Sequence, residues 1–450
     1  MITISIPHNF LPERIYIIDL FFNEFLGVNY RIIPKNIRNY ELSLQNSKKL
    51  IINDCFFSNY GDHFEYLKIE NIPSKVKYLK NTFLVEDNIP VIFGTDEMII
   101  STKEIKCGID IFASSFFMLS RWEEYVDKTR DAHNRFPVHA SLAYKNAFLD
   151  RPIVNEYLEM LWNMLINLGY EGNRKTRSFK FIITHDIDLP LMWISPKLFI
   201  RNFAADLIKR HTILGAAKTM RSYILSKVGL ENDPFDTFDL LMDLSEDNGA
   251  QSNFNLMSEG NSIYKKNYTL DDIFIRKLIK KILKRGHKIG FHPSYETYNN
   301  RELWSIEYKK LSSIIPEEIK TGRQHFLRFE VPITWQIWND NRMTYDSTLN
   351  YPEKEGFRCG ICYEYSIFNI LSRKKLELKE SPLIIMDQNF IAYQIVTSDV
   401  MLQKLQILMS KIKKYKGNFV ILWHNSSFNV NPWIEYHKVY KRILHKKGIN

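Results

Sequence analysis

The sequence predicts an α/β protein with a smaller α/β domain at residues 1–172 and a larger domain at residues 173–450. The chain has 450 residues, 45% of them hydrophobic, which is more than a single hydrophobic core usually organises. In the second part, segments with helical spacing of apolar residues alternate with short apolar runs. Such alternation predicts a largely parallel sheet with helices outside it.

The N-terminal part combines short strands with two helices. Apolar runs at 91–93 and 98–100 lie between polar turns and predict strands. Residues 110–125 and 155–168 place large apolar side chains at helical spacing, so both segments predict helices. The polar, glycine-containing segment 169–178 follows and is typical of a domain boundary. We find no pattern in this part that points to a chemical reaction.

The larger domain opens with a strand that ends at Asp188, and four predicted helices then lead into four further predicted strands. The helices are expected at 235–247, 270–285, 301–315 and 398–415, and the strands at 252–257, 288–292, 325–329 and 418–424. Between Asp188 and the first of these helices lies the basic segment 196–229, which also has helical apolar spacing. It has two interpretations, an amphipathic element on a membrane surface or a helical insertion packed on the larger domain.

Charge and cysteine content narrow the function classes. The net charge is +10, but the 61 basic residues are interspersed with 51 acidic ones and form no nucleic-acid reading motif. We therefore expect no nucleic-acid partner. Four cysteines do not make a disulfide framework, and the first residues lack the basic region of an export signal. These features predict a cytoplasmic protein, with peripheral membrane attachment through 196–229 as an open alternative.

Two carboxylates one residue apart are the most informative feature. Asp186 and Asp188 follow an apolar run, and side chains two residues apart on a strand point the same way. One carboxylate can then hold a cation while the other accepts a proton from water. An isolated pair of this kind is more often a solvated turn. Here His292 and His424 also lie at the ends of predicted strands, where the active sites of parallel sheets form.

Five segments of the chain, taken in order, resemble the polysaccharide deacetylases, the family 4 carbohydrate esterases. They are 184–188, 286–295, 323–326, 345–351 with 356–360, and 422–424. The N-terminal part, through 116–125 and 136–137, is similar to that of a bacterial subgroup with an extra N-terminal domain. The resemblance covers about residues 178–430 and implies a distorted (β/α)7 barrel-like domain preceded by the smaller α/β domain.

The resemblance also implies a reaction and the residues that perform it. The expected activity is metal-dependent removal of acetyl groups from N-acetylated sugars of a polysaccharide or its precursor, which makes a carbohydrate the partner. Asp186 corresponds to the general base, His424 to the general acid, and Arg323 to the residue that orients Asp186. Asp188 and His292 correspond to metal ligands.

One position departs from the family pattern. The family supplies two histidines four residues apart, whereas the residue four positions after His292 is Glu296. Because a carboxylate also binds zinc, we expect Asp188, His292 and Glu296 to hold a divalent metal, either zinc or manganese, cobalt or iron. Two other histidines are alternatives for the third ligand. His325 is one, and the second, His185, should point away from both aspartates on a strand.

Four residues are expected to contact substrate or to support the site: His325, Tyr295, Asp346 and Arg358. For Asp346 and Arg358 a structural salt bridge is an equally good interpretation. The missing second histidine also favours an alternative function, in which a catalytically degenerate deacetylase fold binds a glycan or a polysaccharide-assembly partner.

Overall fold

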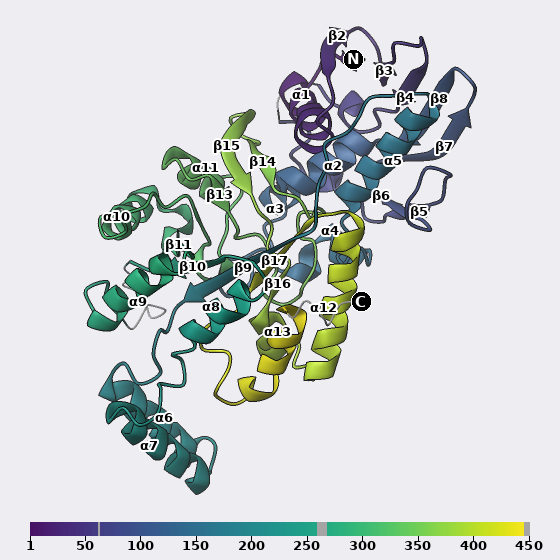
Figure 1. Cartoon of the computed structure of the whole chain (residues 1–450). Coiled ribbons are helices and arrows are strands. Elements are labelled where there is room, and N and C mark those ends of the chain that lie inside the picture. Colours follow the sequence, from purple (N-terminus) through teal and green to yellow (C-terminus); the bar gives the residue numbers. More distant parts are fainter. Residues whose placement is uncertain (62–63, 259–267, 445–450) are drawn as a thin grey trace. The chain divides into compact units, whose positions relative to one another are not determined.

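The computed structural model describes residues 1–61, 64–258 and 268–444 (Figure 1). The chain forms two compact units, and each contains segments that are distant in sequence. The first unit consists of Met1–Lys180, Arg328–Ile384 and Ser410–Phe419, and the second of Phe181–Leu327, Ile385–Met409 and Val420–Asn450. The predicted domain boundary between residues 172 and 173 stays a prediction.

The first unit contains a six-stranded mixed sheet with the order β2-β1-β3-β4-β8-β7. Its strands are β1 (Ile2–Pro7), β2 (Tyr30–Lys35), β3 (Tyr40–Ser43), β4 (Lys49–Ile52), β7 (Gly94–Ile100) and β8 (Glu104–Ile109). The other strands of this unit are β5 (Lys77–Leu79), which pairs with β6 (Ile89–Val91), and β15 (Lys374–Glu380), which pairs with both β13 (Tyr345–Asp346) and β14 (Tyr365–Asn369). The helices are α1 (Leu11–Asp19), α2 (Ile111–Ser120), α3 (Trp122–Val126), α4 (Leu142–Lys145), α5 (Ile153–Asn167) and α11 (Ile333–Asp340).

The predicted helix 110–125 is two helices, α2 and α3. Asp110 begins α2, because its carboxylate accepts the backbone N–H of Ala113 at 2.9 Å. Arg121 then adopts a left-handed backbone with φ of 53°, which ends α2. All ten residues of α2 are buried, so this helix lies in the core of the first unit.

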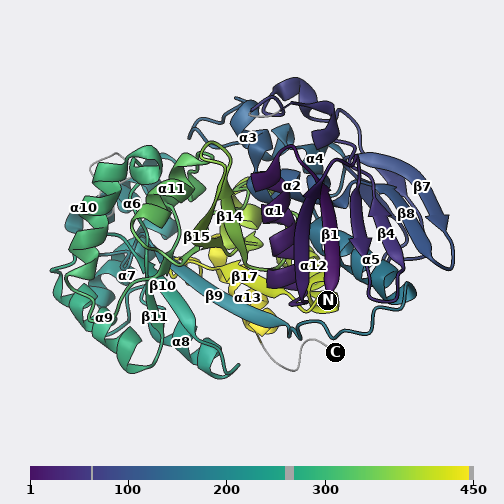
Figure 2. The same cartoon turned by 90° about the horizontal axis from the view of Figure 1, so that it is seen from above.

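The second unit contains strands that are hydrogen-bonded in the order β12-β11-β10-β9-β17-β16. Figure 2 labels β11, β10, β9 and β17 of this sheet. The strands are β9 (Lys180–Ile187), β10 (Ser252–Leu256), β11 (Lys288–Phe291), β12 (Thr321–Gly322), β16 (Ile385–Met386) and β17 (Asn418–Leu422). The neighbouring pairs β12–β11, β11–β10, β10–β9 and β17–β16 are parallel. The helices are α6 (Pro196–Ile208), α7 (Ile213–Lys227), α8 (Phe238–Glu246), α9 (Ile273–Lys284), α10 (Arg301–Ser312), α13 (His437–Leu444) and α12 (Ser398–Lys414), whose last residues, 410–414, belong to the first unit.

This alternation of helices and parallel strands confirms the predicted α/β class. In the part of the chain that the structure describes, the strand order is linear and does not close into a barrel. The predicted strand at 325–329 is wrong. Residues 325–327 instead form a tight turn, because Phe326 and Leu327 have left-handed φ of 60° and 54°, which neither an extended strand nor a right-handed helix allows.

The core of this sheet is apolar, and its carboxyl edge is polar. Ile183, Ile187, Phe254 and Phe291 are buried by 99% or more on β9, β10 and β11. Because parallel strands all point the same way, the polar residues at their carboxyl ends meet at a single edge. No helix of the described residues is long and apolar enough to cross a membrane.

Candidate metal centre

Asp186 lies near the end of β9 and is held by two side-chain donors. Arg323 Nη1 donates to Asp186 Oδ1 at 3.0 Å, and Asn255 Nδ2 on β10 donates to the same oxygen at 2.6 Å. Burial raises the pKa of Asp186, but the positive charges of Arg323 and His292 outweigh it and lower the pKa below its usual value. Asp186 is therefore a fixed and deprotonated carboxylate.

A glycine on β11 makes room for this arrangement. A Cβ atom at Gly290 would overlap Asn255 Oδ1 and lie 2.6 Å from the Asn253 side chain. Any side chain at this position would displace Asn255 and with it one donor to Asp186. The absence of a side chain on β11 thus positions the carboxylate on β9.

Asp188, His292 and His325 form the group that can hold a metal ion among the described residues. One ligand atom from each lies within 4.8 Å of the others. His292 Nε2 is 3.2 Å and His325 Nε2 is 3.6 Å from Asp188 Oδ1. Ligand atoms around one tetrahedral zinc ion lie about 3.4 Å apart, given metal–ligand bonds of about 2.0–2.2 Å. The three side chains therefore have the spacing of a metal site.

The surroundings of these three side chains also fit metal ligands. Asp188 Oδ1 is buried and faces the imidazole nitrogens of His292 and His325, and His325 Nδ1 is buried without a hydrogen-bond partner among the described residues. A bound cation would satisfy the oxygen, which is otherwise costly to bury. His292 Nδ1 donates to the carbonyl of Arg323 at 2.7 Å, which leaves Nε2 to face Asp188. A backbone acceptor on the far nitrogen is the usual support of a metal-binding histidine.

The charges of the group also suit a cation. Burial raises the pKa of Asp188, but His325 and His292 outweigh it and hold the pKa far below its usual value. Burial lowers the pKa of His325 to about 4, so its imidazole is neutral at pH 7 and able to bind metal. Burial would also lower the pKa of His292, but Asp186 and Asp188 raise it, so a proton and a cation compete for this ring.

The third member of this group is His325, whereas the sequence spacing predicts Glu296. Glu296 is half-buried beside the 3-10 helix Thr297–Asn299 and does not belong to the group. The left-handed residues Phe326 and Leu327 allow the chain to turn sharply after β12, next to His325. His185 is turned away from the metal group. Its Nδ1 donates to the carbonyl of Trp423 at 2.7 Å, and its Nε2 lies 3.1 Å from Ser252 Oγ.

His424 lies two residues after β17 and is oriented by a buried aspartate. Asp387 Oδ1 accepts from His424 Nδ1 at 2.8 Å, and Asp387 Oδ2 accepts the backbone N–H of His424 at 3.0 Å. His424 Nε2 is 3.7 Å from Asp188 Oδ2. Burial lowers the pKa of His424, but Asp387 and Asp188 outweigh it and raise the pKa to about 9. The ring is therefore protonated at pH 7 and presents Nε2–H to the metal group.

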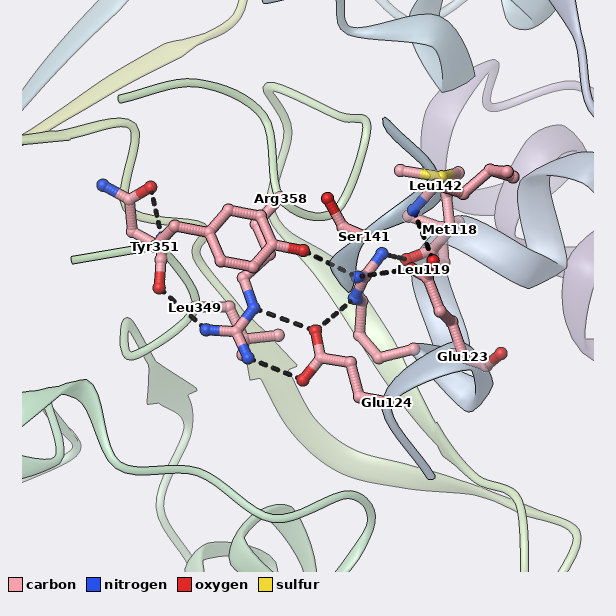
Figure 3. Close-up of polar contacts among 12 residues, drawn as sticks. Met118, Leu119, Glu123, Glu124, Ser141, Leu142, Leu349, Tyr351 and Arg358 are labelled. Atoms are coloured by element: carbon pink, nitrogen blue, oxygen red, sulfur yellow. Dashed lines mark hydrogen bonds and ion pairs between the residues drawn. The ribbon is translucent and has the colours of Figure 1, made fainter. Parts of the chain in front are cut away.

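The other predicted site residues divide between the two units. Tyr295 is half-buried in the second unit, and its ring meets that of Phe326 with centroids 5.4 Å apart. Asp346 and Arg358 belong to the first unit. Arg358 forms a bidentate pair with Glu124 on α3, at 2.9 Å and 2.6 Å (Figure 3).

Arg358 belongs to a buried network in the first unit. Glu124 also accepts from Arg121 at 2.9 Å, and Arg121 in turn lies 3.2 Å from the hydroxyl of Tyr351 (Figure 3). Asp346 accepts the backbone N–H of Thr348 at 3.0 Å. Arg358 thus forms a buried ion pair, and its support of the site stays a prediction.

Asn255 and Asp387 are functional candidates that the sequence pattern does not single out. Asn255 lies inside a predicted strand, and Asp387 directly follows the two-residue strand β16, which is too short to give a periodic signal. The sequence shows only that each is a polar residue that lies in, or directly after, an apolar run. That feature is common in turns and strand ends, so it identifies a site only when neighbouring strands are known.

Comparison with known proteins gives limited information. Residues 2–170 match the model of DUF7033, a family of unknown function. No curated protein sequence matches the chain. The chain is similar to the crystal structure of a Mycobacterium smegmatis protein that is provisionally assigned as a polysaccharide deacetylase, with 13% sequence identity and a TM-score of 0.38. The similarity covers 61% of this chain and 86% of that chain. A likeness this weak carries no argument about function.

Proposed function

We propose that the protein is a metal-dependent hydrolase that removes acetyl groups from N-acetylated sugars of a polysaccharide or its precursor. The observation that carries the proposal is the Asp188–His292–His325 group beside the fixed carboxylate of Asp186. The order of the five sequence segments supports the substrate class. We also propose the distorted barrel of the polysaccharide deacetylases as the fold type of residues 173–450.

Asp188, His292 and His325 are the residues that would hold a divalent cation. When bound, such an ion supplies a Lewis acid that polarises an acetyl carbonyl and acidifies water. Two imidazoles and one carboxylate suit zinc, and they also suit iron or cobalt. The proposed ligand set thus contains more nitrogen than the Asp188–His292–Glu296 set expected from sequence.

Asp186 and His424 divide the proton transfers in this proposal. Asp186 is held deprotonated, with Oδ1 occupied by Arg323 and Asn255, so Oδ2 is left to accept a proton from the attacking water. His424 is protonated and oriented by Asp387, so Nε2–H donates its proton to the departing amine. An amine is a poor leaving group until it is protonated, which is why the reaction needs both residues.

Acetate release from N-acetylglucosamine oligomers tests this proposal, with the protein loaded in turn with zinc, cobalt, manganese or iron(II). Asp186→Asn should abolish acetate release and keep nearly all the metal, whereas Asp188→Ala should lose both. Equal loss of metal in the two variants would refute the division of roles.

The alternative is a degenerate deacetylase fold that binds a glycan or an assembly partner without catalysis. The departure at Glu296 favours it, because the family's second histidine is missing from its usual place. Oligomer binding by metal-loaded protein, without acetate release from any oligomer, would support this alternative.

A further inference from the structure

The helices α6 and α7 form a hairpin that is built on its own small core. The two helices lie side by side (Figure 1). The rings of Phe199 and Tyr223 stack with centroids 4.2 Å apart, and Trp193 meets Tyr223 edge-on at 5.9 Å. Asp233 fixes the start of the hairpin, since its two oxygens accept the backbone N–H groups of Met192 and Trp193 at 2.7 Å and 2.8 Å.

The outer surface of this hairpin is apolar to an unusual degree. Three residues next to its turn are highly exposed, with Ile208 at 70%, Ile213 at 82% and Leu214 at 67%. The other exposed apolar residues in and just after the hairpin are Ile200, Leu207, Met220, Ile224, Val228 and Leu230. We call residues 207–214 the hairpin tip. A cluster of large apolar side chains of this size in water usually marks an interaction surface.

The charges of the hairpin are almost all positive. Residues 196–229 contain Lys197, Arg201, Lys209, Arg210, Lys218, Arg221 and Lys227 against a single acid, Asp206, so their net charge is +6. Asp206 is itself neutralised by Arg210 at 2.5 Å and hydrogen-bonded by Thr219 at 2.6 Å. Arg221 is likewise paired with Glu231 at 2.6 Å, just after the segment. The remaining five basic residues of 196–229 have no acidic partner among the described residues, so the apolar residues are interleaved with positive charge, which is the pattern of an element that lies on anionic lipid.

We propose that the α6–α7 hairpin docks the second unit on an anionic membrane surface, with the hairpin tip entering the lipid interface. This role is independent of the proposed hydrolysis. It favours the first of the two interpretations of segment 196–229. Only residues 189–195 separate Asp188 from the first residue of α6, so docking would tether the end of β9 to the membrane surface.

Vesicle co-sedimentation of the full-length protein tests the proposal. The vesicles contain phosphatidylcholine alone or phosphatidylcholine with 30 mol% phosphatidylglycerol, at low and physiological salt. We expect binding to the anionic vesicles only. Lys209→Gln/Lys218→Gln should weaken it about 30-fold, as expected for two charges near an anionic surface. Ile213→Ser/Leu214→Ser should weaken it by about 10-fold or more, because two exposed apolar side chains would no longer enter the interface.

A matched control separates docking from unspecific attraction. Lys277→Gln/Lys280→Gln removes the same charge from the exposed face of α9 and should leave vesicle binding within about twofold of the parent. No binding to anionic vesicles, or an equal loss in the control, would overturn the proposal. Self-association that both hairpin variants abolish, without vesicle binding, would overturn it in favour of a second copy of this chain as the occupant.

Discussion

Glu124→Gln should lower the free energy of unfolding by about 3 kcal/mol at pH 7. Glu124 is buried in the first unit and paired with Arg358 and Arg121 (Figure 3). Burial raises the pKa of Glu124, but the two guanidinium groups outweigh it and hold the pKa at about 2, against an ordinary value of 4.5. This difference corresponds to about 3 kcal/mol. Breaking a buried ion pair by removing one partner costs a similar amount, about 3–5 kcal/mol.

The pH dependence of this effect has a definite sign. A carboxylate with a lowered pKa in the folded state stabilises the protein above its unfolded pKa, and this contribution is lost as the pH falls through the folded pKa. The advantage of the parent over Glu124→Gln should therefore shrink between pH 4.5 and pH 2, and reach about 1 kcal/mol at pH 3. Urea unfolding of both full-length proteins across this range measures it.

Glu123→Gln is the matched control, because Glu123 lies in the same network with the opposite shift. Burial raises the pKa of Glu123 to about 7. A raised pKa contributes stability below the unfolded pKa that is lost as the pH rises through the folded pKa. The advantage of the parent over Glu123→Gln should thus shrink as the pH rises from 4.5 to 7. A cost below about 1 kcal/mol for Glu124→Gln at pH 7, or the same pH trend in both variants, would show that the two arginines do not stabilise an ionised Glu124.

Three further predictions concern the candidate metal centre. Arg323→Gln removes the positive charge that lowers the pKa of Asp186 most, so the pKa of Asp186 should rise and acetate release should be lost at a higher pH than in the parent. An unchanged pH profile of kcat/KM would contradict the role of Arg323. Asp387→Asn should reduce kcat by about 10–100-fold with metal content unchanged, since Asp387 orients His424 without touching Asp188; metal loss measured in this variant would argue for a structural role. Gly290→Ala should displace Asn255 and lower kcat while circular dichroism stays that of the parent, and full activity would show that Asn255 does not position Asp186.

The sequence predicts the elements that have strong periodicity and the polar residues that follow them. The strand ending at Asp188, the run before His292 and the helix near α5 can all be predicted from local patterns. The division of the first unit cannot, because 328–384 and 410–419 join 1–180 through contacts between distant residues. The pair formed by Glu124 and Arg358 spans 234 positions and leaves no local signal.

The third position of the metal group shows the same limit. The family pattern places the second ligand four residues after His292, and this position is Glu296. Such a pattern can only predict ligands that lie in one continuous segment. His325 reaches the group from the segment after β12, where Phe326 and Leu327 adopt left-handed backbone conformations that no residue preference indicates. Neither residue is a glycine or asparagine, so a strand is the natural prediction for 325–329.

The metal content of purified protein distinguishes the two ligand sets. Elemental mass spectrometry of the parent, His325→Ala and Glu296→Ala, after incubation with zinc and removal of unbound metal, compares the two ligand sets in one experiment. We expect about one equivalent of metal in the parent and in Glu296→Ala, and almost none in His325→Ala, if His325 is the third ligand. Metal lost from Glu296→Ala but kept by His325→Ala, or no metal in the parent, would contradict this assignment.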